Sequence, residues 1–131
     1  MPEKQSDRSP AHASPASGYA GDVSVDEAWR LLAEDPNAVL VDVRTMAEWT
    51  YVGTPDLSSI GKRPLLIEWQ TFPDRDINPD FTATIARVIP DKDAPLLFIC
   101  RSGARSAAAA AMLTARGFTR AYNVAEGFEG D

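Results

Sequence analysis

The chain has 131 residues, of which 44% are hydrophobic, and a formal net charge of −6 at pH 7. This length allows one domain with a core, and the acidic balance argues against nucleic acid or an anionic membrane as the main partner. The single cysteine, Cys100, excludes an internal disulfide, and the single histidine, His12, lies outside the expected domain. Hydrolases with a histidine base and clustered zinc sites are therefore not expected. A lone thiol fits a reducing compartment, so we predict a cytoplasmic location.

The first 21 residues are predicted to be a disordered tail. They are rich in Ser, Pro and Ala and contain no aliphatic run, so ordering them would bury too little apolar surface to offset the lost entropy. The tail lacks the apolar core of a secretory signal, and no stretch of the chain has the length of a transmembrane helix. The folded domain is expected over residues 22–131.

Helices and strands are expected to alternate along this domain. We predict helices over about residues 25–34, 46–51, 79–88 and 105–116, and strands over 38–43, 65–67, 96–100 and 121–124. The first helix has a capping box of Ser24 and Glu27, the third has Asn78 as N-cap, and Gly117 ends the fourth. The strands are apolar runs that are typical of buried parallel strands. The alternation predicts α/β layers around a mainly parallel sheet.

The candidate site lies in the loop that follows the strand over residues 96–100. Cys100 ends this strand, and an open α/β sheet places its ligand site at the carboxyl ends of its strands. The unpaired N–H groups of the next helix, with Arg101 and Arg105, should hold a small anion over the thiol and depress its pKa. Gly103 lets the backbone turn inward without a side chain in the way. The alternative is an inert, buried cysteine.

The segment from Cys100 to Ser106 resembles the active-site loop of single-domain members of the rhodanese family. Residues 41–49, with Asp42, Arg44 and Glu48, resemble the family's early strand and turn, and residues 123–127 resemble its closing strand and glycine turn. The resemblance covers residues 22–131 and implies a rhodanese-like three-layer sandwich, with a small, mainly parallel sheet flanked by helices. Because family members usually continue into another helix, the chain is expected to lack a final C-terminal helix.

This resemblance implies a sulfurtransferase without a cofactor or a metal. Cys100 would take sulfane sulfur from thiosulfate or a similar anion as a persulfide, and pass it to an acceptor thiol, to cyanide or to a sulfur-accepting protein. The residues expected to form the cradle for the substrate are Arg101, Ser102, Gly103, Ala104, Arg105 and Ser106. Arg101 or Arg105 would bind the donor oxyanion, with an ion pair to Asp42 or Glu48 as the alternative for Arg105. Asp42, Arg44 and Glu48 are expected to support the fold.

The sequence is also compatible with other functions. A phosphatase or arsenate reductase of the Cys-x5-Arg type also uses a strand, a loop and a helix, but here Arg105 follows Cys100 after four residues, which suits one sulfur atom better than phosphate. A non-enzymatic interaction module or a sulfur-relay module is a further alternative.

Where rhodaneses commonly have Gly-His-Ile, this chain continues from Gly53 into Thr and Pro. The pocket wall is therefore expected to differ, with Trp69 and Phe72 either lining it or packing in the core.

Overall fold

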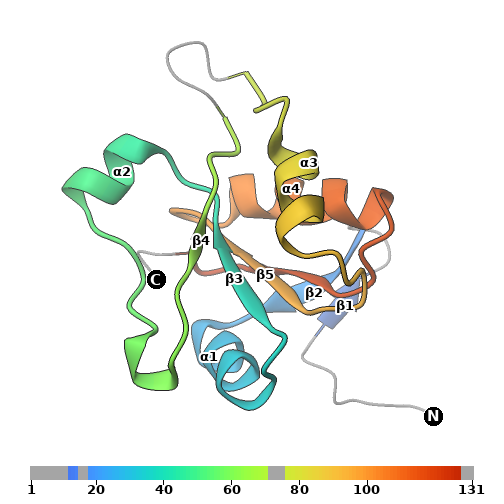
Figure 1. The fold of residues 1–131 in the computed structure, drawn as a ribbon, viewed down its shortest axis with the longest axis horizontal. Coiled ribbons are helices and arrows are strands. Elements are labelled where there is room, and N and C mark those ends of the chain that lie inside the picture. The colour runs from blue at the N-terminus through green and yellow to red at the C-terminus, as the bar shows by residue number, and fades with distance from the viewer. Residues whose placement is uncertain (1–11, 15–17, 71–75, 128–131) are drawn as a thin grey trace.

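The fold is given by a computed structural model that describes residues 12–14, 18–70 and 76–127. Within these residues the centre is a six-stranded sheet with the order β1-β2-β6-β5-β3-β4 (Figure 1). The strands are β1 (His12–Ser14), β2 (Tyr19–Val23), β3 (Val39–Asp42), β4 (Leu65–Leu66), β5 (Leu96–Ile99) and β6 (Ala121–Val124). Neighbours from β2 to β4 run parallel, and β1 pairs antiparallel with β2.

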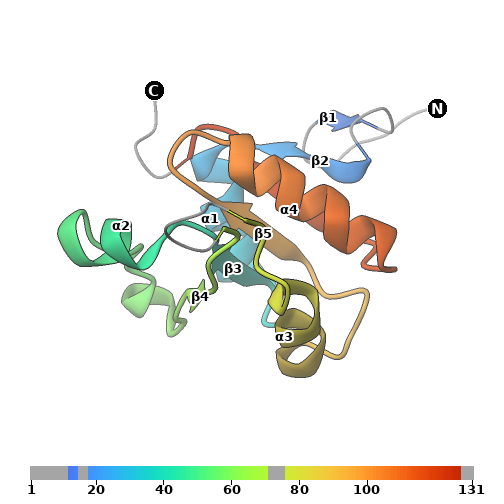
Figure 2. The same cartoon turned by 90° about the horizontal axis from the view of Figure 1, so that it is seen from above.

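Helices cover both faces of the sheet (Figures 1 and 2). Helix α1 (Val25–Glu34) packs on one face, and α3 (Phe81–Val88) and α4 (Ala104–Ala115) pack on the other. Helix α2 (Met46–Tyr51) and the short 3-10 helix η2 (Ser58–Ile60) lie in the connection from β3 to β4. These layers confirm the predicted fold class, a three-layer α/β sandwich with a small, mainly parallel sheet.

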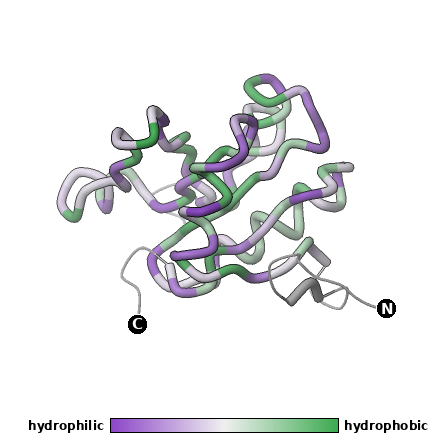
Figure 3. Tube along the Cα trace, turned by 90° about the horizontal axis from the view of Figure 1, so that it is seen from below, coloured by the Kyte–Doolittle hydropathy of each residue, from purple (hydrophilic) through white to green (hydrophobic). Residues whose placement is uncertain are grey.

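The central strand β5 explains why two cores form. All of its residues are buried, and successive side chains point to opposite faces. Leu96 and Phe98 join the core under α3 and α4, together with Cys100 directly after the strand. Leu97 and Ile99 join the core under α1. Hydrophobic stretches of the chain accordingly run through the interior (Figure 3), and this double burial fixes the end of β5 where the cysteine lies.

Local capping sets the helix boundaries. The predicted capping box of α1 is present, with the Glu27 N–H donating to Ser24 Oγ at 3.1 Å. Helix α3 begins at residue 81 and not at 79, because Asn78 Oδ1 accepts from the Asp80 N–H at 3.0 Å in a turn ahead of the helix. Gly117 follows α4 with a φ of 99°, as a helix-terminating glycine does.

The N-terminal strands correct the prediction of a tail over residues 1–21. Strand β2 was not predicted, because it has no aliphatic run and is held by backbone pairing with β6, in which Asp22 lies opposite Asn123. Of that tail, residues 12–14 belong to β1 and residues 19–21 to β2.

Several sequence-based predictions lie outside the described residues. These are the rest of the tail (1–11 and 15–17), Phe72 as a candidate for the pocket wall, and the end of the expected domain (128–131). Among the residues that the structure does describe, no helix is long and apolar enough to cross a membrane.

Candidate functional site

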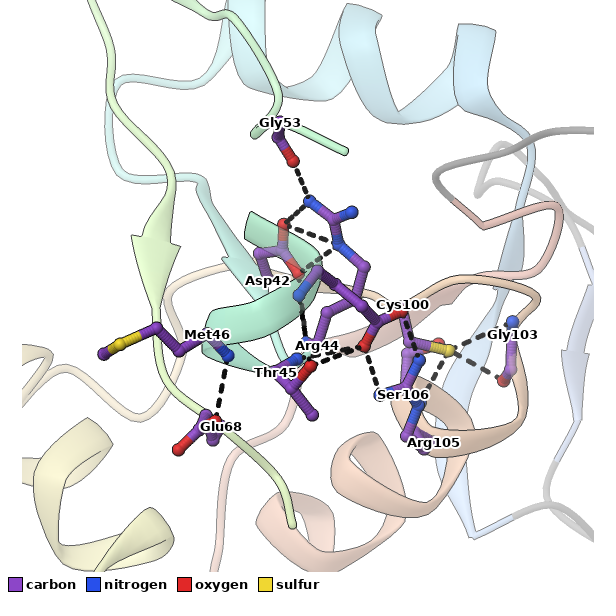
Figure 4. Close-up of polar contacts among 11 residues, drawn as sticks. Asp42, Arg44, Thr45, Met46, Gly53, Glu68, Cys100, Gly103, Arg105 and Ser106 are labelled. Carbon is purple, nitrogen blue, oxygen red and sulfur yellow. Dashed lines mark hydrogen bonds and ion pairs between the residues drawn. The ribbon is translucent and has the colours of Figure 1, made fainter. Parts of the chain in front are cut away.

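The sulfur of Cys100 is surrounded by hydrogen-bond donors (Figure 4). Cys100 follows the last residue of β5, and the chain then turns through three residues into α4. The Gly103 N–H donates to Cys100 Sγ at 3.1 Å and the Ser106 N–H at 3.4 Å, while Ser106 Oγ lies 3.2 Å from the same sulfur. The two N–H groups are among the unpaired backbone donors expected at the start of a helix. The loop is therefore arranged to stabilise negative charge on the sulfur.

Two glycines allow the loop to close around the sulfur. Gly103, the residue ahead of α4, has a φ of 105°, which residues with a side chain rarely adopt. A Cβ atom at Gly103 would collide with the Ala125 carbonyl oxygen, and one at Gly127 would collide with the Arg101 carbonyl oxygen. The cysteine loop and the turn after β6 thus interlock through backbone contacts, which accounts for a glycine in each.

Hydrogen bonding lowers the pKa of the Cys100 thiol. Burial alone would raise this pKa, since the side chain is only 1% exposed. Hydrogen bonds from the Ser106 side chain and from the backbone N–H groups of Ser106, Gly103 and Ser102 outweigh burial and bring the pKa below its ordinary value. The N–H groups of the loop and helix start contribute to the shift as predicted, and their hydrogen bonds, rather than Arg101 and Arg105, are its main lowering causes. A cysteine buried in purely apolar surroundings would show the opposite shift.

Arg105 pairs with Glu48, as one of the alternatives from the sequence proposed. Arg105 Nη1 and Nη2 donate to the two carboxylate oxygens of Glu48 at 2.8 and 3.0 Å. This arrangement, together with hydrogen bonds from Thr45, lowers the pKa of Glu48 to about 2. Attraction to Glu48, and also to Cys100, raises the pKa of Arg105. Glu48 also caps α2 through Thr45, so the ion pair joins α2 to the start of α4.

Asp42 and Arg44 form a separate buried pair after β3. Asp42 is 0% and Arg44 1% exposed. Arg44 Nε and Nη2 donate to the Asp42 carboxylate at 2.8 to 3.1 Å, and Nη2 also donates to the Gly53 carbonyl oxygen at 2.6 Å. The guanidinium thus ties the end of β3 to the segment after α2 (Figure 4). These contacts fit the expected supporting role, and the Asp42 alternative for Arg105 is not the ion pair found.

The remaining predicted residues divide between the surface and the core. Arg101, Ser102 and Ala104 are exposed around the buried sulfur, and Arg101 makes further contacts. Trp69 is 5% exposed and packs edge-on against Phe81, with ring centroids 5.0 Å apart. Trp69 is therefore a core residue and not part of a pocket wall.

Sequence reasoning missed one group of polar residues behind the cysteine. Asn123 on β6 is 4% exposed, and its Oδ1 lies 2.5 Å from Ser106 Oγ. Its Nδ2 donates to Asp22 Oδ1 on β2 at 3.0 Å, and the Tyr19 hydroxyl donates to the same oxygen at 2.7 Å. Asn123 was noted only as part of a turn signature. The one available signal was an amide inside an otherwise apolar strand.

A donor-lined cysteine thus lies at the carboxyl end of a central parallel strand, where open α/β sheets place their sites, in a three-layer sandwich of the rhodanese-like type. Residues 20–131 match the family described as the STR4 middle domain. The chain belongs to this family.

Two similar proteins cover most of the chain. The crystal structure of Rv0390 from M. tuberculosis is 49% identical, with a TM-score of 0.76 over 86% of this chain and 83% of that one. An uncharacterized protein of Rickettsia rickettsii is 42% identical over 106 residues, which is 80% of each chain.

More distant relatives carry rhodanese and sulfur-transfer names. The chloroplastic rhodanese-like domain-containing protein 4 of Arabidopsis thaliana is 28% identical over 108 residues, 82% of this chain and 22% of that protein. The solution structure of the polysulfide-sulfur transferase homodimer of Wolinella succinogenes is 25% identical, with a TM-score of 0.62 over 87% of this chain and 72% of that one. The rhodanese-like fold is thus shared with a protein that is named as a sulfur transferase.

Proposed function

We propose that this protein is a sulfurtransferase that carries sulfane sulfur as a persulfide on Cys100. The main support for this proposal is that the Gly103 N–H, the Ser106 N–H and the Ser106 hydroxyl all lie close to Cys100 Sγ. These donors favour a thiolate, the form of cysteine that acts as a nucleophile. The named activity of the Wolinella succinogenes relative supports the same chemistry.

The reaction has two steps that balance without a metal or a redox cofactor. The Cys100 thiolate attacks the outer sulfur of thiosulfate, the sulfur–sulfur bond of thiosulfate breaks, and sulfite leaves with the electron pair. Cys100 then carries a persulfide whose negative charge lies on the outer sulfur. An acceptor thiolate attacks that outer sulfur, becomes a persulfide itself, and leaves Cys100 as the thiolate again. Backbone donors that surround the sulfur stabilise these anions without reorganising.

The rival interpretation is an inert structural cysteine in an interaction module. The burial of Cys100, at 1% exposure, agrees with that interpretation. The two backbone N–H groups directed at the sulfur do not, because they stabilise a thiolate, whereas burial without such donors would suppress the reactivity of the thiol. The cradle therefore favours an active cysteine.

Intact-protein mass spectrometry after incubation with thiosulfate tests the proposal. Because Cys100 is the only cysteine of the sequence, an added sulfur atom that dithiothreitol removes is assigned to that residue. We expect the wild-type protein to gain one sulfur, and Cys100→Ser to gain none while keeping its circular dichroism spectrum. Thiosulfate:cyanide sulfurtransferase activity should disappear in the same variant. A wild-type protein that gains no sulfur from thiosulfate or polysulfide, or a Cys100→Ser variant with substantial turnover, would contradict the mechanism.

A further inference from the structure

A buried chain of hydrogen bonds leads away from the cysteine to the strand that the sequence did not predict. It runs from Cys100 Sγ to Ser106 Oγ (3.2 Å) and from there to Asn123 Oδ1 (2.5 Å). Asn123 Nδ2 then donates to Asp22 Oδ1 at 3.0 Å. Ser106 is 0% and Asn123 4% exposed, so water does not compete for these positions.

Asp22 determines which atom donates and which accepts in these hydrogen bonds. The Asp22 carboxylate only accepts, so it fixes the Asn123 amide with the NH₂ group toward Asp22 and the oxygen toward Ser106. The Ser106 hydroxyl has one proton but three neighbouring acceptors, which are Asn123 Oδ1 at 2.5 Å and, at 3.2 Å each, Cys100 Sγ and the Gly103 carbonyl oxygen. Ser106 can therefore donate to the sulfur only by releasing Asn123.

We propose that Asn123, oriented by Asp22, is a positioning residue that competes with Cys100 for the hydroxyl proton of Ser106. When the sulfur is a thiolate, Ser106 directs its proton to Sγ, because hydrogen bonds to a charged acceptor are stronger. When the cysteine carries a persulfide, the charge lies on the outer sulfur and Sγ is neutral, so the proton returns to Asn123 Oδ1. Asn123 thus favours the loaded state over the free thiolate. This second consequence rests on the function proposed above.

Several charged groups surround the cysteine besides Asp22. They come from the loop, from α4, from α2 and from the end of β3: Arg101, Arg105, Glu48, Asp42 and Arg44. Any variant of Asp22 that alters its charge also changes the electrostatic potential at the sulfur. This effect on the pKa of Cys100 must be separated from an effect on the Ser106 hydroxyl proton. A double-mutant cycle with Ser106→Ala makes that separation, because removing the hydroxyl removes only the second effect.

The first experiment measures the alkylation rate of Cys100 by iodoacetamide against pH. Asn123→Leu removes the competing acceptor, and Asp22→Asn, at a half-buried position, lets the amide turn its NH₂ toward Ser106. Both changes should lower the pH midpoint of alkylation in the wild-type background. In the Ser106→Ala background their effects should be absent or clearly smaller. Thr114→Val serves as the matched control, since it removes the hydrogen bond from Thr114 to the Ala110 carbonyl oxygen on the same helix, and it should leave the midpoint unchanged.

The second experiment measures the fraction of protein loaded with sulfur at a fixed ratio of thiosulfate to sulfite. Asn123→Leu should shift this equilibrium toward the free protein by about twofold to tenfold, the factor expected for one net hydrogen bond. The proposal would be overturned if the variants shifted the pH midpoint of alkylation equally in the wild-type and Ser106→Ala backgrounds. It would also be overturned if neither Asp22→Asn nor Asn123→Leu shifted that midpoint. If the wild-type protein never loads, the proposed function fails, but the alkylation cycle still decides the role of Asn123.

Discussion

Glu48 and Arg105 join α2 to α4 through two parallel hydrogen bonds of 2.8 and 3.0 Å beside the buried cysteine. The pKa of Glu48 falls from 4.5 to about 2, chiefly through Arg105. A carboxyl group whose pKa is lower in the folded state stabilises the fold above its unfolded pKa, and this contribution is lost as the pH falls through the folded pKa. The ion pair should therefore contribute fully above about pH 4.5 and hardly at all near pH 2.

The first prediction compares the free energy of unfolding of Glu48→Gln with that of wild type. Because the two side chains are 24% and 23% exposed, solvent screens the pair, and we expect a loss of about 1 kcal/mol at pH 6. The loss should shrink progressively between pH 4.5 and 2, as measured by urea denaturation. Asp35→Asn is the control, because its pair with Arg120 is longer (3.9 Å) and more exposed and should contribute less at pH 6. A pH-independent loss would show that the charge of Glu48 is not what stabilises the fold.

The second prediction concerns the reactivity of Cys100. Because the donors of the loop lower its pKa, the alkylation rate of the native protein should reach half of its maximum at a lower pH than that of the same chain unfolded in urea. The unfolded chain is an internal control with the same thiol and no cradle. The thiolate should also stabilise the fold above the unfolded pKa of the thiol, and lose that effect as the pH falls through the folded pKa. A native midpoint equal to or above the unfolded one would mean that burial outweighs the donors.

The third prediction uses two glycines with positive φ. Gly61→Ala introduces the backbone strain of a side chain at a φ of 71° where no other atom is close, and should cost about 1 kcal/mol. Gly103→Ala adds a collision with the Ala125 carbonyl oxygen to the strain at a φ of 105°. Thermal unfolding should show a clearly larger loss for Gly103→Ala, and sulfur loading should disappear while Gly61→Ala loads normally. Equal effects of both substitutions would contradict the interlocked loops.

Much of this fold follows from local sequence, and the centre of the site does as well. The apolar run that ends in Cys100 and the alanine-rich helix after it are strong local signals, so β5, the loop and α4 were predicted within one or two residues. The capping box of Ser24 and Glu27 fixed the start of α1 in the same way. Elements that are stabilised by residues close to them in the sequence can be predicted from the sequence.

The parts that were missed depend on partners far away in the sequence. Strand β2 contains glycine and aspartate, which disfavour strands by themselves, and it forms because β6 offers a parallel edge. The bond between Asn123 and Asp22 spans 101 residues, so no local pattern could reveal it. The pairing of Arg105 was left open between two carboxylates for the same reason, and only the fold decides for Glu48.

The last prediction separates sulfur transfer from phosphate chemistry. Arg105 follows Cys100 after four residues, and the N–H groups of Gly103 and Ser106 converge on the sulfur itself at 3.1 and 3.4 Å. Both features suit a single sulfur atom better than a tetrahedral phosphate. Thiosulfate should therefore load Cys100, whereas a chromogenic aryl phosphate should be neither hydrolysed nor strongly inhibitory. One glycine inserted after Gly103 should enlarge the loop and weaken sulfur transfer. The control is Cys100→Ser, which sets the background rate for both substrates. Hydrolysis of the aryl phosphate that requires Cys100 and rivals sulfur transfer in rate would favour a cysteine phosphatase instead.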